Sequence, residues 1–240
     1  AGTRNYRTLG AKDQDGVRLL PPKRCQCGPA WSDGACRVLI PLTTDRPRRR
    51  SPVLIHALVL MNALVFVWTL SIQSGDPQKY FNLLSTYAVH GENFQWYQLL
   101  TSAFLHGGRM HLLFNMFVLL ALGPNVEDKM GHVGFALLYV IGAAASGGAH
   151  ILMSQNPAIG ASGAIAAVTG AYLVLFPSTR IICFFIFTLS RIAVPAWWFI
   201  GFSIAVDLLA NGLGKGDGIA HAAHLGGYFF GMGSTMILLW

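Results

Sequence analysis

The chain has 240 residues, of which 53% are hydrophobic and only 11% are charged. Because soluble domains average roughly 25% charged residues, this composition argues against a soluble globular protein and favours a membrane protein. The net charge of +7 lies within residues 1–50, which contain eleven Lys or Arg and four Asp or Glu. This segment lacks the fold motifs and interleaved aromatic residues of nucleic-acid-binding proteins, so we expect it to face anionic lipid and to bind no nucleic acid.

Residues 1–51 are predicted to be a basic, poorly ordered cytoplasmic tail that precedes one membrane domain, residues 52–240. The tail is polar, contains several Pro and Arg residues, and shows no apolar stretch with a small-residue cleavage site of the kind that ends a secretory signal. Its cysteines are Cys25, Cys27 and Cys36. Three thiols without a clear fourth ligand make zinc the less favoured alternative, and we expect reduced cysteines.

Six apolar segments are predicted to cross the membrane as helices, which requires roughly 20 mostly apolar residues each. These segments are 52–72, 110–124, 133–153, 163–176, 195–209 and 219–240. The fourth is short, as expected of a helix that begins inside the protein. Residues 181–189 are also apolar but too short to span. We interpret them as an interfacial loop or strand, with a seventh span as the minority alternative.

The positions of Lys and Arg predict the orientation of these helices. Four arginines lie within residues 46–50, directly before the first apolar segment, and cytoplasmic flanks of membrane helices are rich in such residues. Lys129, Arg180 and Arg191 fall in connections on the same side when six helices alternate in direction. The N-terminus is therefore predicted to be cytoplasmic, and Ser162 and His224 to lie near the outer ends of their helices.

The connection 73–109 is long and contains many aromatic and aliphatic side chains. They include Tyr80, Phe81, Phe94, Trp96, Tyr97, Leu99, Leu100 and Phe104. Amphipathic material of this kind is typical of elements that lie in the membrane interface. We expect a partly membrane-inserted element that shapes access to a site, and an outer domain with a small core of its own is the alternative.

Ser162 lies in the sequence Gly160-Ala161-Ser162-Gly163, at the start of an apolar run. Polar side chains at membrane depth are costly, so they are usually paired or functional. A serine hydroxyl is a weak nucleophile that needs a neighbouring general base. Ser162 is thus a candidate nucleophile, although serines between small residues also simply pack membrane helices.

His224 is the best candidate for the base. It precedes Gly227 and Gly231, whose G-x-x-x-G spacing allows two helix backbones to approach closely. Because positions i, i+3 and i+7 share one face of a helix, these glycines would press His224 towards the Ser162 helix. His221, one turn earlier, competes for the role of base.

His221 and His224 also form a His-x-x-His pair, a spacing that can bind a metal. Asp217 is the only carboxylate near this pair in the sequence, so we expect no metal site here.

His111 and Asn115 share a helix face at a spacing of i, i+4. Acyl transfer builds negative charge on the carbonyl oxygen, and preorganised hydrogen-bond donors stabilise that charge. The backbone N–H groups of Ser162 and Gly163 would add donors, because the first four N–H groups of a helix lack partners within it. Taken alone, Asn115 would more simply bond a neighbouring helix, with His111 at the membrane interface.

The three motifs together resemble the rhomboid intramembrane serine proteases. They are His111-x-x-x-Asn115, Gly160-x-Ser162-Gly163 and Ala223-His224-x-x-Gly227-x-x-x-Gly231, in this order on three predicted helices. The resemblance covers about residues 52–240. It implies an all-α polytopic membrane protein, a six-helix rhomboid-like bundle with a Ser/His dyad below the outer membrane surface.

The resemblance also implies roles for individual residues. Ser162 would be the nucleophile and His224 the base, in a dyad without an acidic group. His111 and Asn115 match the oxyanion positions, helped by the backbone N–H groups of Ser162 and Gly163. Trp96 and the segment 73–109 match the first outer loop. Structural roles fall to Gly160, Gly227, Gly231 and Glu127, the last in what resembles the family's turn after the second helix, 123–127.

One position departs from the family pattern. Many members carry an aromatic residue four positions after the serine, packed on the catalytic imidazole, whereas this chain has Ala166. We expect Tyr172 or Phe229 to support the ring of the base instead, and a more loosely held base is the alternative.

The function implied is an intramembrane serine endopeptidase that cleaves transmembrane segments of single-pass membrane proteins, without cofactor, metal or ATP. Its partners would be these substrates and membrane lipid. The scissile backbone must be extended, so helix-weakening residues such as Gly should favour cleavage, and the family implies small side chains before the cut. One alternative is a catalytically weak or inactive rhomboid-like protein that binds membrane helices.

A second alternative is a transporter or channel that moves protons through intramembrane histidines. It predicts charged residues on several helices, whereas Asp207 is the only acidic residue well inside a predicted span. The expected location is a bacterial inner membrane, because residues 40–47 resemble bacterial members. The mitochondrial inner membrane is the alternative, because residues 221–227 resemble the mitochondrial branch.

Overall fold

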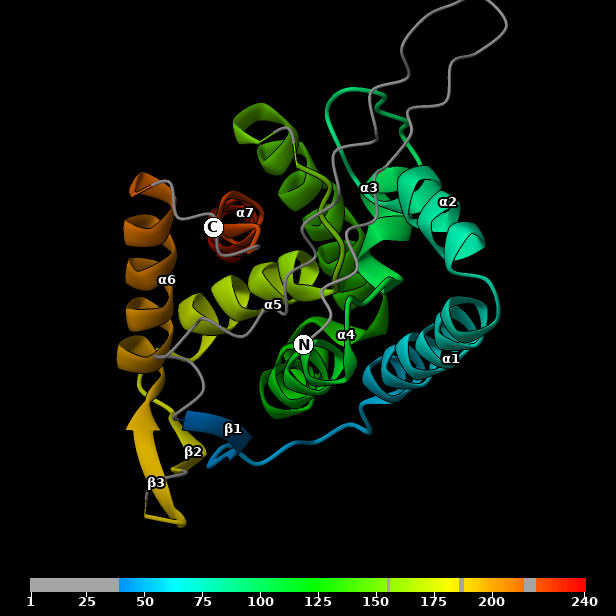
Figure 1. Ribbon diagram of the computed structural model, residues 1–240. Helices are drawn as coiled ribbons and strands as arrows, with labels where there is room; N and C mark the ends of the chain where they lie inside the picture. The colour runs from blue at the N-terminus through cyan, green and yellow to red at the C-terminus, as the bar shows by residue number, and fades with distance from the viewer. Residues whose placement is uncertain (1–38, 155, 186–187, 214–218) are drawn as a thin grey trace, which may run out of the picture.

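The computed structural model describes residues 39–154, 156–185, 188–213 and 219–240. Figure 1 shows a bundle of helices with a small sheet at one end. In chain order the elements are β1 (Leu39–Thr44), α1 (Val53–Gly75), α2 (Pro77–Tyr87), α3 (Gln98–Thr101), the 3-10 turn η1 (Ser102–Phe104), α4 (Arg109–Met153), α5 (Ser162–Leu175), β2 (Arg180–Phe185), β3 (Ser190–Pro195), α6 (Ala196–Gly212) and α7 (His221–Leu239).

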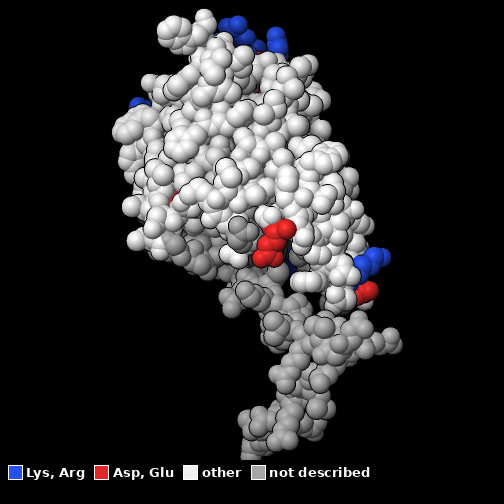
Figure 2. Space-filling view, turned by 90° about the horizontal axis from the view of Figure 1, so that it is seen from above, with Lys and Arg blue, Asp and Glu red and all other residues white. Residues whose placement is uncertain are grey.

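The six predicted spans coincide with helices except at a few terminal residues, such as Pro195, which ends β3. By length and composition, α1 with 23 residues and α4 with 45 are able to cross a membrane, and α5 and α6 are shorter apolar helices. In α1, Leu60, Leu64 and Val67 are each about 60% exposed, as expected of side chains that face lipid. Figure 2 shows a face that is almost entirely uncharged, with charged side chains at only a few places. The count of six crossings stays a prediction.

The predicted segments 110–124 and 133–153 are joined at a different residue from the one expected. Residues 123–127, interpreted as a turn, are helical and buried inside α4, and Pro124 lies within the helix. The break comes at Gly131, whose φ of 75° is a left-handed conformation that glycine adopts most readily. The expected turn was therefore wrong: the reversal occurs where a glycine permits the backbone angle, not at the proline.

The predicted domain boundary at residue 51 stays a prediction, but a short part of the predicted tail forms a strand. Residues 39–44 form β1, which pairs antiparallel with β2 in a sheet of order β1-β2-β3. The Asp45 side chain then accepts a hydrogen bond from the Arg180 backbone N–H at 3.0 Å. The apolar segment 181–189, expected as a loop or a strand, supplies the partner strand. Residues 1–38, with Cys25, Cys27 and Cys36, lie outside the described residues.

Glu127 ties α4 to the start of α1. Its carboxylate oxygens accept hydrogen bonds from the backbone N–H groups of Leu54 at 2.9 Å and Ile55 at 3.1 Å. These N–H groups belong to the first turn of a helix, where no intrahelical partner exists and negative charge is favoured. The His132 Nδ1 lies 2.6 Å from the same carboxylate. Glu127 thus acts as a cap that joins two helices.

The long connection 73–109 folds as α2, α3 and η1, beside α1 and α4 (Figure 1). Two backbone contacts join it to the loop before α5. Val89 and Ala158 form an antiparallel bridge, and the Gly160 N–H donates to the Ser102 carbonyl at 2.9 Å. Trp96 is 74% exposed on this segment. The connection therefore borders the start of α5, which carries Ser162.

Helix α5 is the centre of the bundle, and every residue from Gly163 to Tyr172 is buried. A helix that is apolar on all sides lies either inside a protein or against lipid, and α5 lies inside the bundle. Helix α7 packs closely on α5 because Gly227 and Gly231 have no side chains. A Cβ added to either glycine would collide with the α5 backbone, at Gly163 and Ala167 respectively. This close approach places the first turn of α7 beside the N-terminus of α5.

Candidate active site

Ser162 and His224 meet where α5 and α7 begin. Ser162 is the first residue of α5, and His224 lies in the first turn of α7. The His224 Nε2 is 2.9 Å from the Ser162 Oγ, a good hydrogen-bond distance. The two residues are 62 positions apart in the chain, so the glycine contacts between α5 and α7 create this proximity.

The turn before Ser162 depends on Gly160. Its φ of 130° lies in the region that residues with a side chain rarely adopt. A Cβ at this position would also lie 2.7 Å from the His111 Nε2 and 3.6 Å from the Ser162 Oγ. Gly160 is therefore required both by the backbone angle and by space, and His111 and Ser162 flank the same point.

His111 and Asn115 reach this region from the first turns of α4. Asn115 is buried, and its Nδ2 has no hydrogen-bond partner among the residues that the structure describes. At the start of α5 the N-cap residue, Ala161, provides no side-chain cap for the first N–H groups. The backbone donors of Ser162 and Gly163 thus lie at the Ser162 turn, and Asn115 lies one helical turn after His111, on the same face of α4.

His106 is a neighbour of the site that the sequence analysis did not identify. Its ring packs edge-on against His111, with centroids 5.1 Å apart. Burial, and secondly the proximity of His111, lower the pKa of His106 from 6.5 to about 3, so the ring is neutral at physiological pH. The only signal in the sequence was a histidine five positions before His111, in a segment interpreted as part of a loop.

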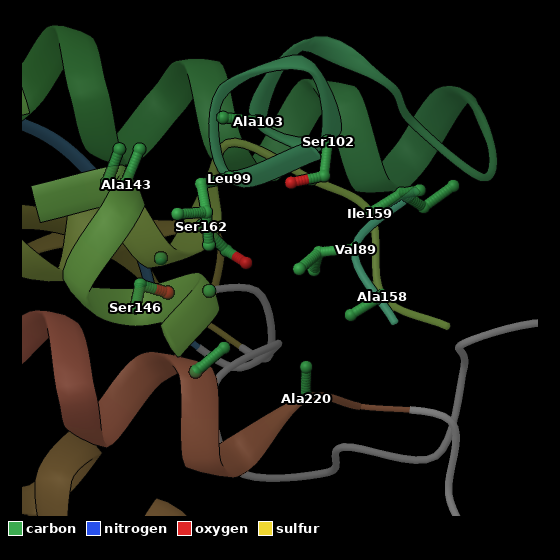
Figure 3. Close-up of a pocket in the computed structure, with 15 residues that line it drawn as sticks. Val89, Leu99, Ser102, Ala103, Ala143, Ser146, Ala158, Ile159, Ser162 and Ala220 are labelled. Carbon is green, nitrogen blue, oxygen red and sulfur yellow. The ribbon is translucent and has the colours of Figure 1, made fainter. Parts of the chain in front are cut away.

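A cavity of about 30 Å³ adjoins Ser162. This volume holds one or two water molecules. Figure 3 shows the Ser162 hydroxyl directed into the cavity, with Val89, Ala158 and Ile159 on the far side and Ser102 above. The lining is mostly alanine, glycine and aliphatic residues, so the space beside the hydroxyl is small and largely apolar.

Asp207 of α6 makes a contact that the sequence analysis did not predict. It was considered only as a sign of a proton transporter, and the base was expected to have no acidic neighbour. In the structure the Asp207 Oδ1 lies 3.2 Å from the His224 Nδ1 and 2.6 Å from the His221 Nδ1. The packing of α6 against α7 creates this contact, and no spacing in the sequence reveals it.

The same contacts distinguish the two histidines of α7. The ring of His224 reaches Ser162, whereas the shorter bond to Asp207 belongs to His221. Ligand atoms of Asp207, His221 and His224 lie within 4.8 Å of one another, a spacing that a divalent cation also accepts. That no metal binds here stays a prediction, and Asp217, considered as a further ligand, lies outside the described residues.

The support expected for the His224 ring is different in the structure. The Tyr172 ring packs on Phe176 at 5.1 Å, and Phe229 is 55% exposed. In the described part of the chain, the His224 ring instead has His221 as an aromatic neighbour, with ring centroids 6.3 Å apart and planes nearly perpendicular. An aromatic residue at position 166 would have no room, because even a Cβ at Gly227 would lie 2.9 Å from the Ala166 Cβ.

Comparison with known proteins agrees with the motifs. A family model described as Rhomboid domain matches residues 93–240, more than half of the chain. RHOMBOID-like protein 4 of Arabidopsis thaliana is 33% identical over 60% of this chain and 34% of its own length. Rhomboid protein 1, mitochondrial, of Saccharomyces cerevisiae is 30% identical over 75% of this chain and 51% of its own.

Rhomboid protease GluP of Bacillus subtilis is 34% identical over 57% of this chain and 25% of its own length. The chain thus spans about half or less of the length of these relatives. The family match agrees with the mostly helical, apolar bundle, and it shows that this chain belongs to the rhomboid family of integral membrane proteins.

Proposed function

We propose that the protein is an intramembrane serine endopeptidase in which Ser162 is the nucleophile and His224 the general base. The observation that carries this proposal is the 2.9 Å distance between the His224 Nε2 and the Ser162 Oγ. A base within hydrogen-bond reach takes the hydroxyl proton as the oxygen attacks a carbonyl. That one relative is named a protease, GluP of Bacillus subtilis, supports the proposal.

The proposed oxyanion donors are His111, Asn115 and the backbone N–H groups of Ser162 and Gly163. A buried donor without a partner costs about 1–3 kcal/mol, so such a group is expected to have a function. The Asn115 Nδ2 is in this state among the described residues. Donors that are fixed in place before the reaction stabilise the developing charge without reorganisation.

The proposed reaction has two stages. His224 takes the Ser162 proton as the Oγ attacks the scissile carbonyl, and then gives that proton to the leaving amine, which leaves an acyl-enzyme. A water molecule then donates a proton to His224 while its oxygen attacks the ester, and Ser162 recovers its proton from His224 as the acid product departs.

The proposed substrates are transmembrane segments of single-pass proteins. Their backbone must be extended at the cut, so residues of low helix propensity, such as Gly, should favour cleavage. The cavity of about 30 Å³ beside the Ser162 hydroxyl, bordered by Ala103, Ala143 and Ala158, suits a small side chain.

We also propose a location and an orientation. The N-terminus would face the cytoplasm, because Arg48, Arg49 and Arg50 lie directly before α1. A bacterial inner membrane is the proposed location and the mitochondrial inner membrane the alternative. The relatives include proteins of both kinds of source.

The test is cleavage of a purified single-span protein with a Gly-containing transmembrane segment, in detergent, by the wild type and by Ser162→Ala. We expect a specific cut by the wild type and none by the variant, with equal thermal stability. Binding of the substrate without cleavage by the wild type would reject the protease and leave a protein that only binds membrane helices.

A further inference from the structure

Asp207 is a buried acidic group that the proposed reaction does not use. It is 7% exposed and lies in α6, a helix made otherwise of apolar and uncharged residues. An ionised carboxylate in such surroundings is costly unless it is paired and hydrogen-bonded. Both of its described partners, His221 and His224, belong to α7.

The geometry determines which ring nitrogen of His224 carries the proton. An ionised carboxylate only accepts hydrogen bonds, so at 3.2 Å from the Asp207 Oδ1 the His224 Nδ1 must be the donor. In a neutral imidazole the other nitrogen is then the acceptor. That nitrogen, Nε2, is the one at 2.9 Å from the Ser162 Oγ.

We propose that Asp207 is a positioning residue for the reaction at Ser162: it holds His224 in the tautomer that accepts the serine proton and stabilises the imidazolium that forms. This inference rests on the proposed roles of Ser162 and His224. Ser162, His224 and Asp207 form one chain of hydrogen-bond distances that crosses three helices, α5, α7 and α6.

His221 acts on the carboxylate in this arrangement. The His221 Nδ1 is only 2.6 Å from the same Asp207 oxygen. His221 therefore holds the Asp207 carboxylate in place, and both histidines interact with the carboxylate's negative charge. His111 and His150 of α4 are the other titratable groups in the described part of the chain that interact electrostatically with His224. Asp207 is therefore the acidic group that faces the His224 ring among the residues that the structure describes.

The first experiment compares Asp207→Asn with the wild type and with Ser203→Ala in cleavage of a single-span substrate in detergent. Asparagine keeps the shape but its amide can donate to Nδ1 and favour the wrong tautomer. Ser203 is the matched control, because it lies one turn earlier on α6 and, among the described residues, its hydroxyl donates to the Phe199 carbonyl of the same helix at 3.0 Å.

We expect Asp207→Asn to lower kcat by roughly 10-fold or more with little change in KM and in thermal stability, and Ser203→Ala to behave as the wild type. An unchanged kcat would overturn the inference. So would a loss that appears mainly in KM or with a large fall in thermal stability, because that pattern indicates a structural contact.

The second experiment does not depend on activity. Nitrogen-15 NMR of histidine-labelled protein in the Ser162→Ala background reads the tautomer of His224, assigned with a His224→Ala sample. We expect the proton on Nδ1 when Asp207 is present and a shift towards Nε2 in Asp207→Asn. The same tautomer in both samples would overturn the inference.

The two experiments separate this inference from the proposed function. An inactive wild type whose His224 tautomer still follows Asp207 would reject the protease and retain the positioning. An active wild type that loses activity with EDTA and regains it with zinc would overturn the positioning role and assign Asp207, His221 and His224 to a metal site.

Discussion

Replacement of Gly231 by alanine tests whether the close approach of α5 and α7 places the base beside the nucleophile. A Cβ at Gly231 would lie 2.7 Å from the Ala167 carbonyl carbon and closer still to its oxygen, whereas ordinary contacts begin near 3.4 Å. The helices must therefore separate by roughly 1 Å, and overpacking of this kind costs about 1–3 kcal/mol. The same displacement would stretch the 2.9 Å distance between the His224 Nε2 and the Ser162 Oγ beyond hydrogen-bond range.

We expect Gly231→Ala to lower kcat/KM by roughly 100-fold, since a 1 Å misplacement of reacting groups has an effect of that order. Cleavage of the single-span substrate gives the activity, and thermal unfolding in detergent gives the stability. The matched control is Gly233→Ala, because a Cβ at Gly233 meets nothing within 4 Å. Wild-type activity in Gly231→Ala, or equal damage in Gly233→Ala, would refute the reasoning.

Three further predictions follow from the site. Asn115→Ala should lower kcat far more than it raises KM, because the transition state loses about 3 kcal/mol of stabilisation. Steady-state kinetics that show only a raised KM would instead assign Asn115 to substrate binding. Ala166→Phe should lower the unfolding temperature, because its ring would meet α7 at Gly227 in a space already filled and overpacking costs about 1–3 kcal/mol; an unchanged temperature would show free space there. The His106 pKa of about 3 in the folded protein lies below the value of 6.5 expected for the unfolded chain. The unfolded chain therefore binds the proton first, and the free energy of unfolding falls as the pH drops from 6.5 towards 3. That loss amounts to about 2 kcal/mol by pH 5, and thermal unfolding at pH 7 and pH 5 should show a smaller difference for His106→Asn than for the wild type.

The helical part of this fold could be predicted from the sequence because long apolar runs ending in polar or helix-breaking residues are local signals. The errors concern contacts between distant segments. Strand β1 was missed because its partner β2 begins 136 residues after it ends. The reversal within α4 was placed at residues 123–127 because they resemble the family's turn after the second helix, whereas the positive φ at Gly131 is visible only in the structure.

In the candidate site too, contacts between distant segments were harder to predict than local features. That Ser162 and His224 lie close together could be predicted, because the spacing of Gly227 and Gly231 indicates which face of α7 packs on another helix. The contact of Asp207 with His224 could not, because α6 carries no comparable small-residue pattern at that face. The replacement of a large aromatic support by Ala166 also becomes clear only when Gly227 is seen to pack against it.

Labelling of Ser162 by a fluorophosphonate in the folded, detergent-solubilised protein tests the central claim most directly, because the probe reacts only with an activated serine. We expect mass spectrometry to find one adduct, on Ser162, that is lost in His224→Ala, because the serine then has no base to take its proton. A folded protein with no adduct on Ser162 would contradict the account.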